Sequence, residues 1–162
     1  MSSLVQLRSL EDLLVTAIAI ATQCHTDQID KAGQPYINHP LRVMAAGNTL
    51  PEKIVGVLHD AVEDSALTLE ELAEAGFPDE ILAAIDAITK REQEPYEGYL
   101  ERVMDNAIAL QVKIADMTDN MDISRIANPT DKDWARLRKY KAILPRLQQR
   151  LPENQEFRRH KD

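Results

Sequence analysis

Cysteine, aromatic residues and glycine are scarce in this sequence of 162 residues. The single cysteine, Cys24, cannot form a disulfide within the chain, so nothing in the sequence requires an oxidising compartment. Because aromatic residues make up only 4%, the core must be built mainly from Leu, Ile, Val, Ala and Met. Apolar residues at 44% and charged residues at 28% are typical of a globular protein, and the length suits one domain, residues 1–162.

Long apolar runs are also missing. The run from Ala17 to Ala21 is far too short to cross a bilayer. The N-terminal residues lack the basic start and the long apolar stretch of a signal peptide, since Arg8, Glu11 and Asp12 interrupt them. We therefore expect a cytoplasmic protein without a membrane partner.

Acidic residues outnumber basic ones by 27 to 19, which gives a formal net charge of -8. Such a field repels nucleic acid and anionic lipid, so the sequence predicts no nucleic-acid partner. If the substrate is a phosphate compound, a metal ion and a few local basic residues must overcome this field. The sequence carries no signature of an oligomeric state.

Helical periodicity dominates the apolar pattern, and no segment shows the period of two that marks a strand. Leu10, Leu13 and Ala17 follow the helical spacing, and Pro51 suits a first helical turn behind the cap Thr49. The predicted helices are 10–27, one from Pro40, 51–63, one between Thr68 and Gly76, 78–90, 96–105, 107–123 and one from Asp131 that bends or breaks at Pro145. The charged residues 153–162 are expected to fray. The predicted fold class is therefore all-α, a single helical bundle.

Histidine is rare, with 4 residues, and His59 has unusual neighbours. His59 and Asp60 follow a strongly apolar stretch, and Glu63 and Asp64 come one helical turn later. A helix with so many apolar residues is expected to be buried, and polar groups set into it need partners. A metal ion would provide one.

Asp116 and Asn120 repeat this pattern, one turn apart at the end of another buried helix. An aspartate in such a place is costly unless it is paired or bound to a metal. Taken singly, these residues have simpler explanations: His39 before Pro40 could cap a helix, and Asp116 could pair with Lys113 or Arg125. Taken together, they form an ordered pattern that single explanations do not account for.

Three segments make up that pattern: GQPYINHPL at 33–41, LHDAVED at 58–64, and VKIAD at 112–116 followed by Asn120. Together they resemble the hydrolase domain of Rel/SpoT-type enzymes and the small stand-alone alarmone hydrolases. The resemblance runs from about residue 10 to about residue 127, and the helix and tail at 131–162 lie beyond it. It implies an HD-domain bundle and a metal-dependent phosphohydrolase that removes the 3′-pyrophosphate from guanosine (p)ppGpp, a small-molecule nucleotide.

The resemblance also implies a role for each matching residue. The metal ligands would be His39, His59, Asp60 and Asp116; Glu63 and Asp64 would position and activate the attacking water; Lys31 and Asn120 would contact the substrate. The metal of the family is typically manganese. Two imidazoles and two carboxylates suit Mn²⁺ or Fe²⁺ on chemical grounds, and they also allow Zn²⁺.

Two positions depart from the family pattern. Asp30 stands where the family usually has an arginine that packs on the guanine base, and Ile123 stands where a threonine is usual. Aspartate offers neither a planar cation nor a stacking surface. A second interpretation is therefore a phosphohydrolase acting on another nucleotide or phosphate ester. A third is a non-catalytic sensor of metal and nucleotide, against which the presence of Glu63 and Asp64 argues.

Overall fold

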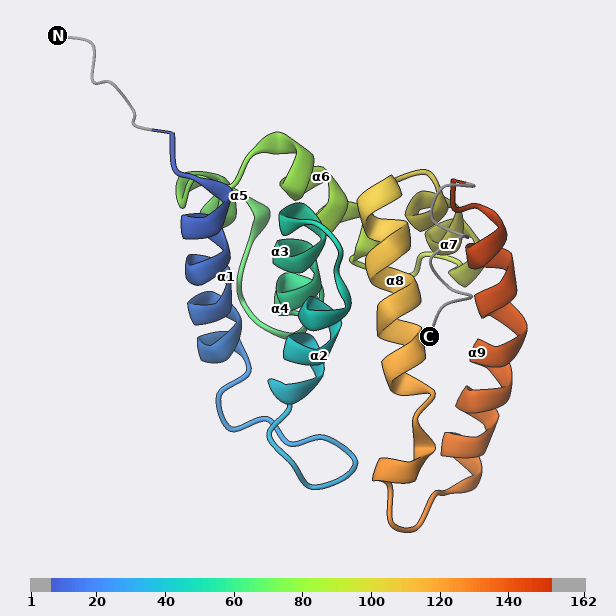
Figure 1. Ribbon diagram of the computed structural model, residues 1–162. Coiled ribbons are helices and arrows are strands. Elements are labelled where there is room, and N and C mark those ends of the chain that lie inside the picture. Colours follow the sequence, from blue (N-terminus) through green and yellow to red (C-terminus); the bar gives the residue numbers. More distant parts are fainter. Residues whose placement is uncertain (1–6, 153–162) are drawn as a thin grey trace, which may run out of the picture.

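The computed structural model describes residues 7–152, which form a helical bundle (Figure 1). Its elements are α1 Leu10–Cys24, α2 Asn38–Ala46, α3 Leu50–Leu58, α4 Ala61–Asp64, α5 Leu69–Glu74, α6 Asp79–Ile88, α7 Tyr96–Met104, α8 Ala107–Asn120, the 3₁₀ helix η1 Ile123–Arg125 and α9 Asp131–Gln149. Extended pairing within this part of the chain is limited to one bridge between Ile29 and Pro35. The predicted all-α fold is confirmed.

Helix α3 lies at the centre of the bundle and packs against α1, α2, α6 and α8. Its residues from Ile54 to Leu58 are buried, which is the pattern of a helix that is apolar on every side. Helix α8 runs beside α3, and α9 covers the other side of α8 (Figure 1). The centre of the bundle is thus formed by α3 and α8, the two segments that carry the candidate site residues.

Short sequence signals set several helix ends. Thr49 and Glu52 form a reciprocal capping box at the start of α3, and Thr68 and Glu71 do the same at α5. Gly76 follows α5 with a φ of 100°, a conformation that glycine adopts without strain. The caps and the stop predicted from the sequence are confirmed at these positions.

The predicted helix at 51–63 is interrupted, and this prediction is wrong in one respect. Helix α3 ends at Leu58, His59 and Asp60 form a turn, and α4 begins at Ala61. The His59 side chain donates its Nδ1–H to the Gly56 carbonyl at 2.6 Å, so it takes an acceptor that a continuing helix would use for the Asp60 amide. His59 and Asp60 therefore stand at a break between two helices.

Other bounds also differ from the prediction. Helix α1 ends at Cys24, before a turn in which Asp27 has a φ of 63°, and α8 ends at Asn120, before η1. Helix α9 does not break at Pro145 but continues to Gln149. Pro145 and the Lys141 carbonyl that loses its partner lie on the exposed side of the helix, where water can replace the missing hydrogen bond.

The predicted fraying of residues 153–162 falls outside the described residues. Among residues 7–152, no helix has the length and apolar character needed to cross a bilayer.

Gly56 allows α2 and α3 to approach closely. A Cβ at Gly56 would lie 3.2 Å from the Met44 backbone, whereas a Cβ at the exposed Gly98 in α7 would meet nothing within 4 Å. Replacing either glycine by alanine gains about 1 kcal/mol of helix propensity. At Gly56 the clash costs about 1–3 kcal/mol.

We therefore expect Gly56→Ala to lower the free energy of unfolding, and Gly98→Ala to raise it by up to about 1 kcal/mol. Urea unfolding of the two variants measures both effects, with Gly98→Ala as the matched control. Equal stabilisation by both substitutions would contradict the close approach of α2 and α3.

Candidate metal centre

Four side chains from three parts of the fold converge on one point. His39 comes from α2, His59 and Asp60 from the turn between α3 and α4, and Asp116 from α8. Asp116 Oδ1 lies 3.0 Å from His39 Nε2 and 3.3 Å from His59 Nε2. Asp60 Oδ2 lies 3.1 Å from His59 Nε2 and 3.7 Å from His39 Nε2. The four metal ligands proposed from the sequence are thus brought together, and both histidines and Asp116 are buried.

Both imidazole rings turn Nε2 toward this point and use Nδ1 elsewhere. His39 Nδ1 lies 2.6 Å from Asp119 Oδ2, and His59 Nδ1 lies 2.6 Å from the Gly56 carbonyl oxygen. Both partners are acceptors, so each Nδ1 carries the proton and donates it. This arrangement is the one that metal-bound histidines show in proteins.

The arrangement places acceptor against acceptor. A neutral imidazole that donates through Nδ1 presents a lone pair at Nε2, and here that lone pair faces carboxylate oxygens. Such a contact is stable only with a positive charge at its centre, either a proton on nitrogen or a metal ion. His39, His59 and Asp60 each offer an atom to a group within 4.8 Å, so the residues fit a divalent ion.

Burial and the neighbouring charges shift the pKa values of the cluster residues in opposite directions. Burial lowers the pKa of His59, but the carboxylates of Asp60 and Asp116 outweigh it and raise that pKa well above its usual range. Burial likewise disfavours the charged form of Asp60, yet His59 lowers the pKa of Asp60 to about 2. Without a metal, the two carboxylates therefore favour a proton on His59.

Metal binding must displace this proton. Because the carboxylates raise the pKa of His59, the affinity for Mn²⁺ is expected to fall as the pH drops. For one displaced proton the dissociation constant rises about tenfold per pH unit. Calorimetric titrations between about pH 8 and about pH 5 test this, and a constant affinity over that range would contradict the proposed ligands.

Neighbouring side chains hold the two carboxylates in place. The Tyr36 hydroxyl donates to Asp60 Oδ2 at 2.6 Å, and Asn120 donates from Nδ2 to Asp116 Oδ1 at 3.0 Å. Lys113 pairs with the second oxygen of Asp116, Nζ to Oδ2, at 2.9 Å. The ion pair considered from the sequence is thus present together with the cluster. Arg125, the other partner considered there, pairs with Asp119 and Asp122 instead.

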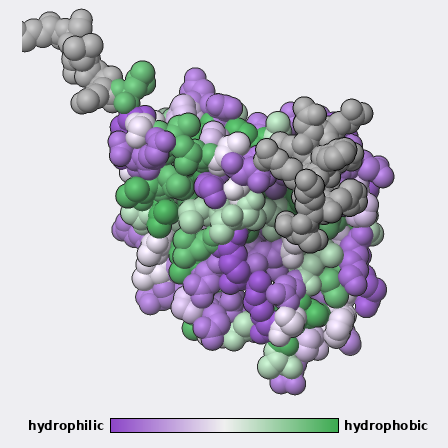
Figure 2. Space-filling model, viewed as in Figure 1, coloured by the Kyte–Doolittle hydropathy of each residue, from purple (hydrophilic) through white to green (hydrophobic). Residues whose placement is uncertain are grey.

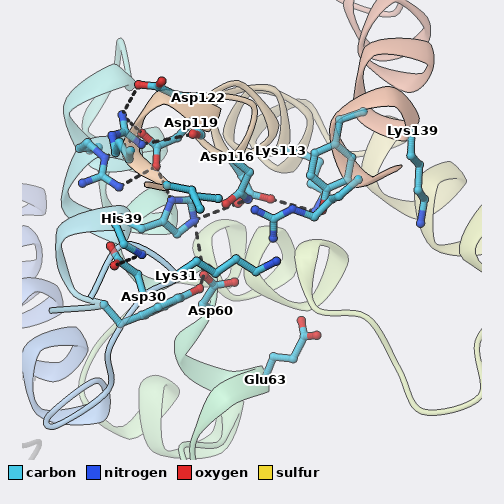
Figure 3. A pocket seen from close by; sticks show the side chains of 18 of the residues that line it. Asp30, Lys31, His39, Asp60, Glu63, Lys113, Asp116, Asp119, Asp122 and Lys139 are labelled. Carbon is cyan, nitrogen blue, oxygen red and sulfur yellow. Dashed lines mark hydrogen bonds and ion pairs between the residues drawn. The ribbon is translucent and has the colours of Figure 1, made fainter. Parts of the chain in front are cut away.

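Three residues of the cluster, His39, Asp60 and Asp116, line a cavity of about 420 Å³, and His59 is not among the lining residues. Hydrophilic residues gather on the face of the molecule over the lower ends of α2 and α8 (Figure 2). Figure 3 shows His39, Asp60, Asp116 and Asp119 turned toward one another. The basic side chains that line the cavity are Lys31, Arg42, Lys90, Lys113, Arg125, Arg136 and Lys139, and the acidic ones are Asp30, Asp60, Glu63, Asp116, Asp119 and Asp122. The cavity therefore lacks the strong negative charge of the whole chain, so an anion can bind in it.

The remaining predicted residues take different positions. Glu63 and Asn120 line the cavity, whereas Asp64, the next residue on α4, is not among the lining residues. Lys31 also lines it, but its Nζ lies 2.5 Å from Asp133 Oδ1 at the start of α9. Lys31 thus ties the loop before α2 to α9 in addition to facing the cavity.

Sequence reasoning missed part of the site. Arg136 and Lys139 also line the cavity, although sequence analysis did not place them at the site. Their spacing of three residues on α9 was a usable signal, because it places both on one side of the helix.

The two positions that depart from the family pattern also have clear roles. Asp30 accepts hydrogen bonds from the amides of Ala32 and Gln34, both at 2.9 Å, so its carboxylate shapes the turn that precedes α2. Ile123 is partly buried in η1 and does not line the cavity.

Comparison with models of known protein families gives no match. Among curated proteins, the probable GTP pyrophosphokinase of Mycobacterium leprae is 34% identical over 148 residues. The probable guanosine-3′,5′-bis(diphosphate) 3′-pyrophosphohydrolase of Synechocystis sp. is 30% identical over 154 residues. These matches cover 83% and 86% of this chain but only 19% and 20% of the two relatives, so the chain spans about a fifth of their length.

A shorter match has a higher sequence identity. The guanosine-3′,5′-bis(diphosphate) 3′-pyrophosphohydrolase of Borreliella burgdorferi is 42% identical over 78 residues, which are 46% of this chain and 12% of that protein. A solved structure of a metazoan orthologue of SpoT, described as hydrolysing ppGpp, superposes with a TM-score of 0.68 over 87% of this chain and 86% of that one. At 21% sequence identity this likeness shows that the two chains share a fold.

Proposed function

Because the chain belongs to the Rel/SpoT-type family of HD-domain hydrolases, we propose that it is one phosphohydrolase domain that removes the 3′-pyrophosphate from (p)ppGpp in the cytoplasm. The products would be GDP or GTP and pyrophosphate. The observation that carries the proposal is that three residues of the His/Asp cluster, Glu63 and a set of basic side chains line one cavity.

We propose that His39, His59, Asp60 and Asp116 hold one divalent ion, with Mn²⁺ as the expected metal. Two imidazole nitrogens and two carboxylate oxygens are a donor set suited to it. When bound, the ion supplies Lewis acidity toward a phosphoryl oxygen and toward water. Loss of activity on chelation and its return with Mn²⁺, compared with Zn²⁺ and Fe²⁺, would identify the metal.

Glu63 is the residue proposed to take a proton from the attacking water. Burial, together with the charges of Asp60 and Asp64, raises the pKa of Glu63 above its usual value. A carboxylate with a raised pKa is a stronger base, which suits general-base catalysis near neutral pH. Burial and the Asp60 charge raise the pKa of Asp64 in the same way, and Asp64 keeps its proposed role of positioning the water with Glu63.

The basic side chains are proposed to bind the phosphate groups. Lys90, Arg136 and Lys139 line the cavity together with Lys113. Figure 3 labels Lys113 and Lys139 among them. Lys31 and Asn120 are proposed to contact the substrate from the cluster side. In the reaction, the water oxygen bonds to the phosphorus next to the ribose, and the bond from that phosphorus to the 3′ oxygen breaks. Glu63 takes the water proton, and the leaving 3′ oxygen gains one.

A second candidate is a phosphohydrolase of the same mechanism with another nucleotide as substrate. The observation that favours it is Asp30, whose Oδ1 accepts hydrogen bonds within its own turn and whose carboxylate offers no planar cation to stack on a base. Incubating the protein with Mn²⁺ and a panel of nucleotides that includes ppGpp distinguishes the two. A clear preference for ppGpp supports the first candidate, and faster release of phosphate or pyrophosphate from another nucleotide supports the second.

A further inference from the structure

We infer that Asp119 is a positioning residue, which fixes the ring of His39 so that Nε2 faces the metal. The inference rests on the proposed metal centre. Asp119 lies in the last turn of α8, three residues after the proposed ligand Asp116, and its side chain is 11% exposed. It does not belong to the four proposed ligands, and Figure 3 shows it on the far side of His39 from Asp60.

The contact between His39 and Asp119 decides which ring nitrogen carries the proton. His39 Nδ1 donates to Asp119 Oδ2 at 2.6 Å, which leaves Nε2 as the lone pair that a metal requires. The opposite tautomer would place a proton on Nε2, where Asp116 Oδ1 lies only 3.0 Å away and would accept it. Asp116 alone therefore favours the tautomer that cannot bind metal, and Asp119 opposes it.

The two histidines are held in different ways. His59 donates to a backbone carbonyl, that of Gly56, whose position is set by α3 itself. His39 has only a side chain as its Nδ1 partner, so its orientation depends on the identity of residue 119. A carboxylate is a stronger acceptor than a carbonyl, and it also increases the basicity of the ring nitrogen that faces the metal.

Asp119 is itself held rigidly. Arg42 donates from Nε to Oδ1 at 2.8 Å and from its terminal nitrogen to Oδ2 at 3.1 Å, a bidentate pair from α2. Arg125 in η1 approaches Oδ1 at 3.1 Å. Arg125 thus still anchors the carboxylate when the Arg42 pair is removed.

A purely structural role makes a different prediction. Since the Arg42 pair joins α2 to α8, Asp119 would then act only by holding these two helices together. Arg42→Met removes that pair but leaves the hydrogen bond between Asp119 and His39 intact. Asp119→Ala removes both, and Asp119→Asn keeps an oxygen acceptor of the same size for His39 Nδ1.

The test is the dissociation constant of Mn²⁺ for the wild-type chain and these three variants, with the unfolding temperature of the chelated proteins measured by circular dichroism. We expect Asp119→Ala to weaken Mn²⁺ binding by about 10–100-fold, Asp119→Asn to recover most of this loss, and Arg42→Met to bind nearly as the wild type does. The unfolding temperatures show how far each variant loses stability without metal.

Unchanged Mn²⁺ binding in a folded Asp119→Ala variant would overturn the inference while leaving the metal centre standing. An equal loss of affinity in Arg42→Met would overturn it in favour of the structural role. A wild-type chain that binds no Mn²⁺ would overturn the proposed metal centre and the inference with it.

Discussion

Glu63→Gln is expected to lower kcat by about 10²–10⁴-fold, because glutamine cannot take the proton from the attacking water. Glu63 lines the cavity without belonging to the four proposed ligands, so Mn²⁺ affinity should stay close to that of the wild type. Glutamine has the same size as glutamate, and the helix that carries it should be preserved. Steady-state pyrophosphate release from ppGpp, together with a Mn²⁺ titration, measures both quantities.

The matched control is Glu70→Gln, which removes the same charge at an exposed position of α5. The pH profile adds a second readout for Glu63. Its raised pKa places the acidic limb of kcat/KM above 4.5, and this limb should be lost from the residual activity of the variant. Near-normal kcat in Glu63→Gln would show that another group removes the proton.

Asp60→Asn is expected to abolish tight metal binding and, with it, hydrolysis. The substitution keeps the size of the side chain and an oxygen for the Tyr36 hydroxyl, which donates to Oδ2 at 2.6 Å. It removes one of the two charged ligands. Loss of a residue that only hydrogen-bonds to a ligand lowers metal affinity by up to about 100-fold, and the loss of Mn²⁺ affinity in Asp60→Asn should be larger. Removing the carboxylate also relieves its repulsion with Asp116, so the chain should remain folded.

Asp86→Asn is a suitable control, because the Asp86 side chain contacts only the exposed Arg91 among the ion pairs of the described residues. Equilibrium dialysis with Mn²⁺ and the rate of pyrophosphate release are the measurements. Partial rescue of Asp60→Asn by a large excess of Mn²⁺ would support a weakened site. Unchanged affinity at low Mn²⁺ would mean that the metal is held elsewhere.

Local sequence signals predicted much of the bundle. The caps at Thr49 and Thr68 and the stop at Gly76 depend on residues within a few positions of each other, and all three are confirmed. The break between α3 and α4 could not be predicted in the same way. It arises because His59 bonds to the Gly56 carbonyl, a choice that depends on how the imidazole is packed.

The candidate site, too, could be predicted only in part from the sequence. His39, His59, Asp60 and Asp116 were proposed from ordered motifs, and the fold brings them together. Asp119 also lies within the third motif, but its contacts with Arg42 and Arg125 depend on how α2 and η1 meet the end of α8.

The spacing of Arg136 and Lys139 places both on one side of α9, but only the fold shows that this side faces the cavity. The same tertiary arrangement explains how a chain with a net charge of -8 can offer a site to an anion. Composition gives the sum of the charges, and only the fold gives their positions.

The most direct test of the account is the release of pyrophosphate from ppGpp by the wild-type chain, first stripped of metal by a chelator and then supplied with Mn²⁺. We expect no release from the stripped protein and restored release, with GDP as the second product, after Mn²⁺ is added. Release that is unaffected by chelation, or no release from ppGpp at any Mn²⁺ concentration, would contradict it.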